Sequence, residues 1–135
     1  MSRLANAIAI IRSSLIAKKQ IAKIQANKKV ILVLNKFQNR GLINGYTYFQ
    51  SAKGGTCKVY LKYDDNFDPI ITYMKMLPEN FRTSWRYSYK NLKNVFINGG
   101  LDVLLSTDKG FLFCSEIVPN RLKIGGKAVL IISIY

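Results

Sequence analysis

The spacing of apolar residues changes at Gly41, and this change constrains the fold more than any other feature of the sequence. Before Gly41, two stretches carry apolar residues three and four positions apart, which is typical of the buried face of a helix. After Gly41, most apolar residues fall in strand-length segments separated by glycines or polar turns. A chain of 135 residues forms one ordinary domain or two very small ones. The pattern predicts an α+β fold with two small subdomains.

The N-terminal subdomain is predicted over residues 1–63 as an α-β-α-β-β unit. Its expected elements are a helix, a strand, a second helix and two strands, at residues 3–19, 20–25, 27–40, 42–50 and 56–63. Asn27 is a good N-cap for the second helix, and Gly41 supplies the residue just past its end. Ile21 and Ile24 are expected to face inward from the first strand. The first helix carries an apolar stripe at Leu4, Ala7, Ile8, Ile11 and Leu15.

A polar loop at residues 64–68 is the best boundary, and it holds three of the seven acids. The Gly and terminal Glu of an EF-hand loop are missing there, which disfavours a calcium site. The C-terminal subdomain, residues 69–135, is predicted to be mostly antiparallel β with a short helix. Its expected strands are 69–77, 82–89, 101–105 and 127–135, and a helical turn is expected within 111–123. Pro119 is expected near the start of that turn.

The charge balance points to a polyanionic partner. The chain has 21 Lys and Arg against 7 Asp and Glu, a formal charge of +14. In a folded domain such a balance favours nucleic acid first and an anionic membrane surface second. No run of 18 apolar residues occurs, so no membrane span is expected. Two alternatives stay open, a basic RNA-binding protein and a membrane-surface or partner-binding protein that uses the basic N-terminal helix.

Enzyme chemistry is poorly supported. Histidine, the commonest general base and metal ligand, is absent. Cys57 and Cys114 fit no zinc or redox spacing, and nothing requires a disulfide between them. No P-loop, dinucleotide fingerprint or nucleophile elbow occurs. We therefore expect no enzyme activity, no cofactor, no metal and no small-molecule substrate.

Two segments have side chains suited to RNA. The turn at residues 106–110 combines short hydroxyl side chains, a cation and a glycine, which lets the backbone approach a sugar–phosphate surface. The segment 81–90 interleaves cations with aromatics, which suits phosphate pairing and base stacking. Its candidate contacts are Arg82, Arg86 and Tyr87. The turn contributes Ser106, Thr107, Asp108, Lys109 and Gly110.

Taken together, these segments resemble the eighth small-subunit ribosomal protein family. The turn 106–110 followed by Gly125, Gly126, Lys127 and an apolar final strand is similar to the family's C-terminal end. Arg82 and Arg86 match the two arginines of its Arg-Pro-Gly-x-Arg strip. In the N-terminal half the likeness includes the segments 11–12, 28–29, 41–43 and 61–63.

The sequence departs from the family's residue types at two places. Thr83 and Ser84 replace the Pro-Gly of the arginine strip. The segment 112–114 replaces the usual Met-Thr-Asp/His start of a helix, and Ser115 is expected to serve as the N-cap instead.

The resemblance implies a structural, non-enzymatic protein that binds the central domain of small-subunit rRNA mainly through its C-terminal half. It also implies contacts of the N-terminal half with RNA and with neighbouring ribosomal proteins. Arg12, Lys28 and Lys29 match positions in that half and complete the set of candidate RNA contacts.

Composition bears on the compartment. Ile, Lys, Asn and Tyr, which have AT-rich codons, are abundant, and Lys outnumbers Arg 15 to 6. Residues 3–19 fit a mitochondrial presequence but also match the family's own first helix, so we expect no removable extension. An organelle-encoded protein of the mitochondrial ribosome is therefore expected, with a plastid or bacterial cytoplasmic ribosome as the alternative.

Overall fold

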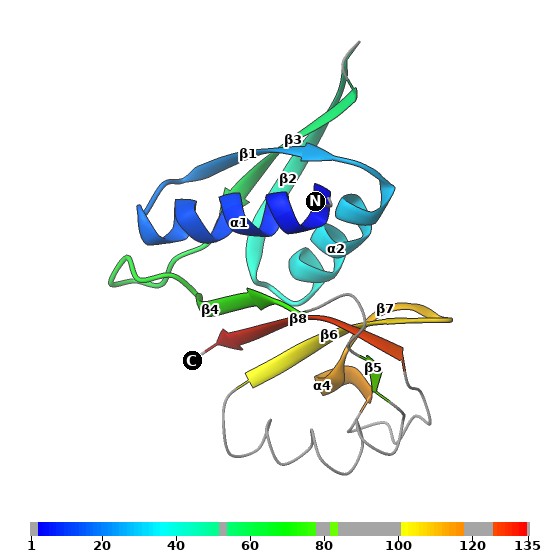
Figure 1. Cartoon of the computed structure of the whole chain (residues 1–135). Helices are drawn as coiled ribbons and strands as arrows, with labels where there is room; N and C mark the ends of the chain where they lie inside the picture. The colour runs from blue at the N-terminus through cyan, green and yellow to red at the C-terminus, as the bar shows by residue number, and fades with distance from the viewer. Residues whose placement is uncertain (1–2, 52–53, 78–81, 84–100, 118–125, 135) are drawn as a thin grey trace. The chain divides into compact units, whose positions relative to one another are not determined.

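The computed structural model describes residues 3–51, 54–77, 82–83, 101–117 and 126–134 (Figure 1). The chain divides into two compact units, residues 1–71 and 72–135, which we call unit 1 and unit 2. In the described residues, unit 1 joins two helices to an antiparallel sheet, and unit 2 joins a second sheet to a short helix. The predicted α+β class is confirmed.

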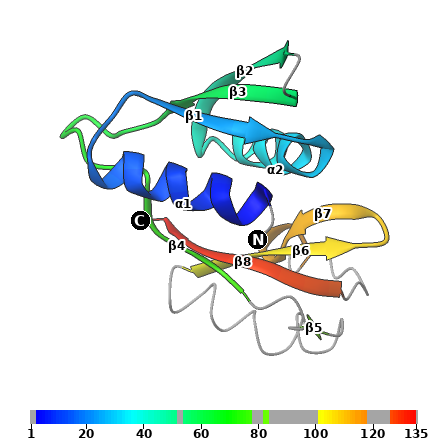
Figure 2. The same cartoon turned by 45° about the horizontal axis from the view of Figure 1, so that its top comes forward.

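Unit 1 has the predicted order of elements. They are α1 (Arg3–Ile16), β1 (Ile21–Ala26), α2 (Lys28–Asn39), β2 (Ile43–Ser51) and β3 (Gly54–Leu61). The strands pair in the order β1-β3-β2, and both pairings are antiparallel. Both views show α1 running beside β1 (Figures 1 and 2). The core of this unit forms where the apolar faces of the helices meet the inward residues of the sheet.

Helix α1 buries the predicted stripe but ends earlier than expected. Leu4, Ile11 and the other residues of the stripe are buried. The helix stops at Ile16 because Lys18 adopts a left-handed conformation with φ 56°. The Lys19 N–H then donates to the Ser14 carbonyl at 2.9 Å, which closes the end as in a Schellman motif. The predicted end at residue 19 was wrong because a non-glycine residue occupies the left-handed position.

Helix α2 has both predicted caps. The Val30 N–H donates to Asn27 Oδ1 at 3.0 Å, which satisfies a free donor of the first turn. At the other end Gly41 has φ 76°, and the Leu42 N–H donates to the Phe37 carbonyl at 2.9 Å. Phe37 is fully buried and anchors the helix in the core of unit 1.

One side chain of strand β1 faces the opposite way from the prediction. Its burial alternates strictly, with Ala22, Ile24 and Ala26 inward. Ile21 is 42% exposed, so the prediction that it faces inward with Ile24 was wrong. Two residues three positions apart lie on opposite faces of a strand, because side chains alternate.

Strands β2 and β3 form an antiparallel hairpin, and their pairing extends to Ser51 and Gly54. Residues 52–53, which connect the two strands, lie outside the described residues. Cys57 lies on the inward face of β3 as a free, buried thiol. Burial raises the pKa of the Cys57 thiol, because the thiolate would lose its hydration. The thiol therefore keeps its proton at neutral pH and is a weak nucleophile.

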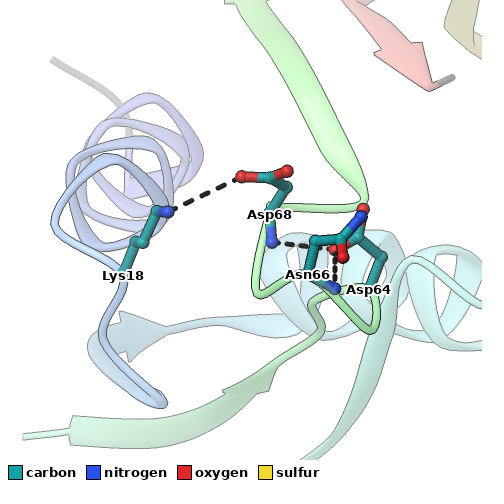
Figure 3. A network of polar contacts seen from close by, with 4 residues as sticks. All are labelled: Lys18, Asp64, Asn66 and Asp68. Atoms are coloured by element: carbon teal, nitrogen blue, oxygen red, sulfur yellow. Dashed lines mark hydrogen bonds and ion pairs between the residues drawn. The ribbon is translucent and has the colours of Figure 1, made fainter.

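The acidic loop at residues 64–68 is held by its own hydrogen bonds (Figure 3). Asp64 Oδ1 accepts from the backbone N–H groups of Asn66 and Asp68, each at 2.9 Å. Lys18 Nζ lies 3.6 Å from Asp68 Oδ1, so the loop is also tied to the end of α1. The hydrogen bonds to its carboxylate give Asp64 a structural role in shaping the turn.

Unit 2 is built on a five-stranded sheet. Its described elements are β4 (Ile71–Met76), β5 (Arg82–Thr83), β6 (Leu101–Thr107), β7 (Gly110–Phe113), α4 (Cys114–Ile117) and β8 (Gly126–Ile134). The sheet runs β4-β8-β6-β7, and β5 pairs with β8. Leu104, Leu130 and Ile132 are fully buried and form the centre of its core.

The segment after Gly110 differs from the prediction. Residues 110–113 form a strand, because they pair with β6 from Thr107 back to Leu104. The helix α4 starts at Cys114, so the expectation of Ser115 as N-cap was wrong. The start expected near Pro119 lies outside the described residues. Of the predicted strand at 82–89, only residues 82–83 are described, and the remainder lies outside the described residues.

Candidate nucleic-acid interface

The turn between β6 and β7 forms an exposed part of the candidate RNA surface. The strands close at the pair Thr107 and Gly110, which leaves a two-residue connection of Asp108 and Lys109. Asp108, Lys109 and Gly110 are exposed, whereas Ser106 and Thr107 are half-buried. Gly110 has φ 99°, a conformation that glycine adopts without steric cost. The hairpin therefore presents a cation at its tip, with open space around Gly110.

Thr107 holds this turn in shape. Its hydroxyl donates to the Gly110 carbonyl at 2.7 Å and accepts from the Lys109 N–H at 3.1 Å. The hydroxyl proton is thus engaged within the protein. Thr107 therefore fixes the shape of the turn.

The sheet of unit 2 aligns three predicted contacts in one row. Ser106 on β6 is the Cα partner of Lys127 on β8, and Lys127 is the Cα partner of Arg82 on β5. Residues directly opposite in an antiparallel pair are close neighbours. Gly126 lies one position along β8, opposite Thr83. Segments distant in the sequence therefore meet at the end of the sheet that carries the hairpin turn.

A buried acid fastens α4 beside this sheet. Asp102 on β6 is 2% exposed, and its Oδ2 accepts from Ser115 Oγ at 2.7 Å. Its Oδ1 accepts from the backbone N–H groups of Val103 at 2.8 Å and Ser115 at 3.3 Å. No local pattern predicts this pair, because the residue type alone does not distinguish a buried Asp in an apolar strand from an exposed Asp in a loop. Ser115 thus anchors α4 to β6 from inside the helix.

The predicted contacts of unit 1 lie on its helices. Arg12 is exposed on α1, and Lys28 and Lys29 are exposed in the first turn of α2. The first turn of α2 contains no acid. Cations there oppose the positive end of the helix dipole, so these lysines reduce the stability of α2. The lower stability of α2 has a reason if these two charges contact RNA.

This conflict between stability and binding can be tested with Lys29→Glu. We expect the variant to gain about 0.5 kcal/mol in the free energy of unfolding, because an acid suits the start of a helix. The same variant should bind RNA more weakly, because it brings a negative charge toward phosphates. Urea unfolding and a filter-binding assay give the two readouts. Equal RNA affinity in the two proteins would show that Lys29 lies away from the nucleic acid.

Arg86, Tyr87 and Gly125 lie outside the described residues. Of the remaining predicted contacts, those of the C-terminal half gather at the hairpin end of the unit 2 sheet. Those of the N-terminal half belong to unit 1.

Charge is distributed unevenly along the chain, since residues 1–63 carry twelve cations and no acid. None of the described helices is long and apolar enough to cross a membrane.

Two small α/β-type units with a formal charge of +14 and an exposed hairpin turn are typical of a basic nucleic-acid-binding protein without catalytic groups. Residues 2–135 match the family model described as ribosomal protein S8. The chain therefore belongs to the ribosomal protein S8 family, as the resemblance in its sequence suggested. This is a family of structural ribosomal proteins and not of enzymes, and rRNA binding is typical of it.

Relatives of the chain are named as proteins of the small ribosomal subunit. The chain is 26% identical over 126 residues to the small ribosomal subunit protein uS8 of Nautilia profundicola, covering 93% of each chain. It is 28% identical over 134 residues to the uS8 of Petrotoga mobilis, covering 96% of this chain and 90% of that one. A third relative is uS8m of Dictyostelium discoideum, 30% identical over 80 residues, covering 59% of this chain and 52% of that one. The chain is thus a structural protein of the small ribosomal subunit.

Proposed function

We propose that the chain binds small-subunit rRNA through an RNA-binding edge formed by the β6–β7 turn and the row of Ser106, Lys127 and Arg82. The observation that carries this proposal is the pairing of β5, β8 and β6, which aligns the row at the hairpin end of the sheet. The exposed tip adds Lys109, and Thr107 keeps the turn in shape.

The expected mode of binding follows from the chemistry of duplex RNA. An A-form helix hides the base edges of its major groove, so a protein contacts the shallow minor groove with its 2′-hydroxyl groups. Phosphate contacts of Lys and Arg fix orientation, whereas short polar groups reach the sugar edge. The RNA-binding edge offers both kinds of group at the end of a rigid sheet. Binding of this kind requires no reaction, and the protein acts without catalysis.

The variant Lys109→Ala tests the edge directly. We expect it to bind a central-domain fragment of small-subunit rRNA more weakly, with a salt dependence about one unit shallower in slope, because one phosphate contact is lost. The measurement is affinity at four or five salt concentrations. Lys75→Ala is the matched control, because Lys75 is an exposed cation on β4 outside the edge. Equal slopes for Lys109→Ala and the unmodified protein would exclude a phosphate contact at the tip.

The ribosome concerned is proposed to be mitochondrial. The AT-rich codon bias of the composition and the likeness to the uS8m protein of Dictyostelium discoideum support this assignment. Bacterial uS8 proteins match a larger share of the chain, and a bacterial or plastid ribosome is the competing assignment. Immunodetection across sucrose-gradient fractions of a whole-cell lysate and of isolated mitochondria decides between them. Recovery with the mitochondrial small subunit supports the assignment, and recovery only with cytoplasmic or plastid subunits rejects it.

A further inference from the structure

Strand β1 offers a free hydrogen-bonding edge. It has β3 as its one neighbour among the described strands. The Leu61 N–H donates to the Gln20 carbonyl at 2.9 Å, and the β1–β3 register pairs the next residue, Ile21, with Tyr60. In an antiparallel ladder, hydrogen-bonded pairs recur at every second residue. The backbone groups of Ile21, Lys23 and Gln25 therefore point away from β3.

A groove follows this edge, and its lining comes from α1, β1 and β3. One section, of about 620 Å³, is lined by Arg3, Asn6, Ile10 and Gln25 among others. A second section, of about 560 Å³, continues along Ile10, Lys19 and Ile21. Ile10 and Ile21 are 40% and 42% exposed, which leaves apolar surface open to solvent. The groove thus combines unpaired strand backbone with apolar side chains.

Charge determines what can occupy the groove. The cations Arg3, Lys19, Lys23 and Lys58 line its two sections, and no acid lines either one. A second copy of this basic strand would bring like charges together, so Lys23 protects the edge against self-association. The same charge attracts a strand that carries acids.

We propose that the β1 edge binds an extended acidic segment of a neighbouring protein by strand addition. The backbone of the segment would hydrogen-bond to Ile21, Lys23 and Gln25, as in other cases of β-augmentation. Alternate side chains of an added strand face opposite sides of the sheet. Its apolar side chains would therefore cover Ile10, and its acids would meet Lys23 and Lys58 on the other side.

The features of the groove favour a protein occupant over RNA. A free strand edge alternates N–H donors with carbonyl acceptors, and phosphate oxygens can pair only with the donors. A peptide backbone satisfies both kinds of group. The groove is also lined by aliphatic side chains and lacks an aromatic ring on which an unpaired base would stack.

The test uses the full chain and a blocked peptide in which Glu alternates with Val. Gln25→Pro removes one outward N–H while leaving the pairing with β3 intact, and edge strands tolerate such a proline. Gln25→Ala is the matched control, because it removes the side chain and keeps the N–H. Fluorescence anisotropy should show an affinity close to that of the unmodified protein for Gln25→Ala. For Gln25→Pro we expect a loss of about tenfold, because an acceptor of the peptide loses its donor.

Charge reversal provides an independent readout if the proline variant fails to fold. Lys23→Glu should lower the affinity for the Glu–Val peptide about tenfold and raise the affinity for a Lys–Val peptide, because the substitution reverses the charge at the β1 edge. Equal affinities of Gln25→Pro and Gln25→Ala would overturn the proposal. The groove would be assigned to RNA instead if oligouridylate displaced the peptide and bound Gln25→Pro as tightly as it binds the unmodified protein. Binding of the rRNA fragment should be the same for both Gln25 variants, so this test stands apart from that of the RNA-binding edge.

Discussion

Asp102→Ala should destabilise unit 2 by about 3 kcal/mol, one of the two largest effects that we expect from any single substitution in this chain. The Asp102 carboxyl group is buried and accepts hydrogen bonds from the Ser115 hydroxyl and from two backbone N–H groups. Its removal leaves these donors without their acceptor at a largely buried position. The loss should appear in urea unfolding and as faster hydrogen exchange of β6 and α4.

Two milder changes at the same contact give the controls. Asp102→Asn keeps one oxygen acceptor and should cost about 1 kcal/mol. Ser115→Ala removes only the 2.7 Å bond from the hydroxyl and should fall between the other two variants. If Asp102→Ala unfolded at the same urea concentration as the unmodified protein, Asp102 would not fasten α4 to the sheet.

Phe37→Ala should reduce the stability of unit 1 by about 4 kcal/mol, because it removes a large buried side chain and leaves a cavity. Phe37 is 0% exposed and lies on the buried face of α2. Leu32→Ala on the same helix is the control, because Leu32 is 43% exposed and its truncation should cost less than about 1 kcal/mol. Hydrogen exchange of the α1 and α2 amides distinguishes the two variants. Similar protection in both would show that α2 does not depend on the burial of Phe37.

The helices and most strands could be predicted because local pattern determines them. Apolar spacing marked the buried faces of α1 and α2, and Asn27 and Gly41 marked the caps of α2. The end of α1 was missed because Lys18, which carries no signal for a left-handed conformation, occupies that position. Strand β7 was missed because a short apolar run after Gly110 suits either a strand or a helical turn, and only its pairing with β6 decides.

The candidate site was predicted in its parts but not in its assembly. The residue types at 106–110 indicated a compact turn, and the hairpin confirms it. The row of Ser106, Lys127 and Arg82 depends on the register of strands far apart in the sequence, which no local pattern encodes. The same holds for Asp102, whose buried carboxyl finds Ser115 only after the sheet has formed.

Photo-crosslinking of the purified protein to small-subunit rRNA, followed by identification of the linked peptides, tests the central claim most directly. We expect linked peptides that contain residues 106–110 and Lys127, and their yield should fall in Lys109→Ala. Cross-links confined to unit 1, with the β6–β7 turn unmodified at saturating RNA, would contradict the account.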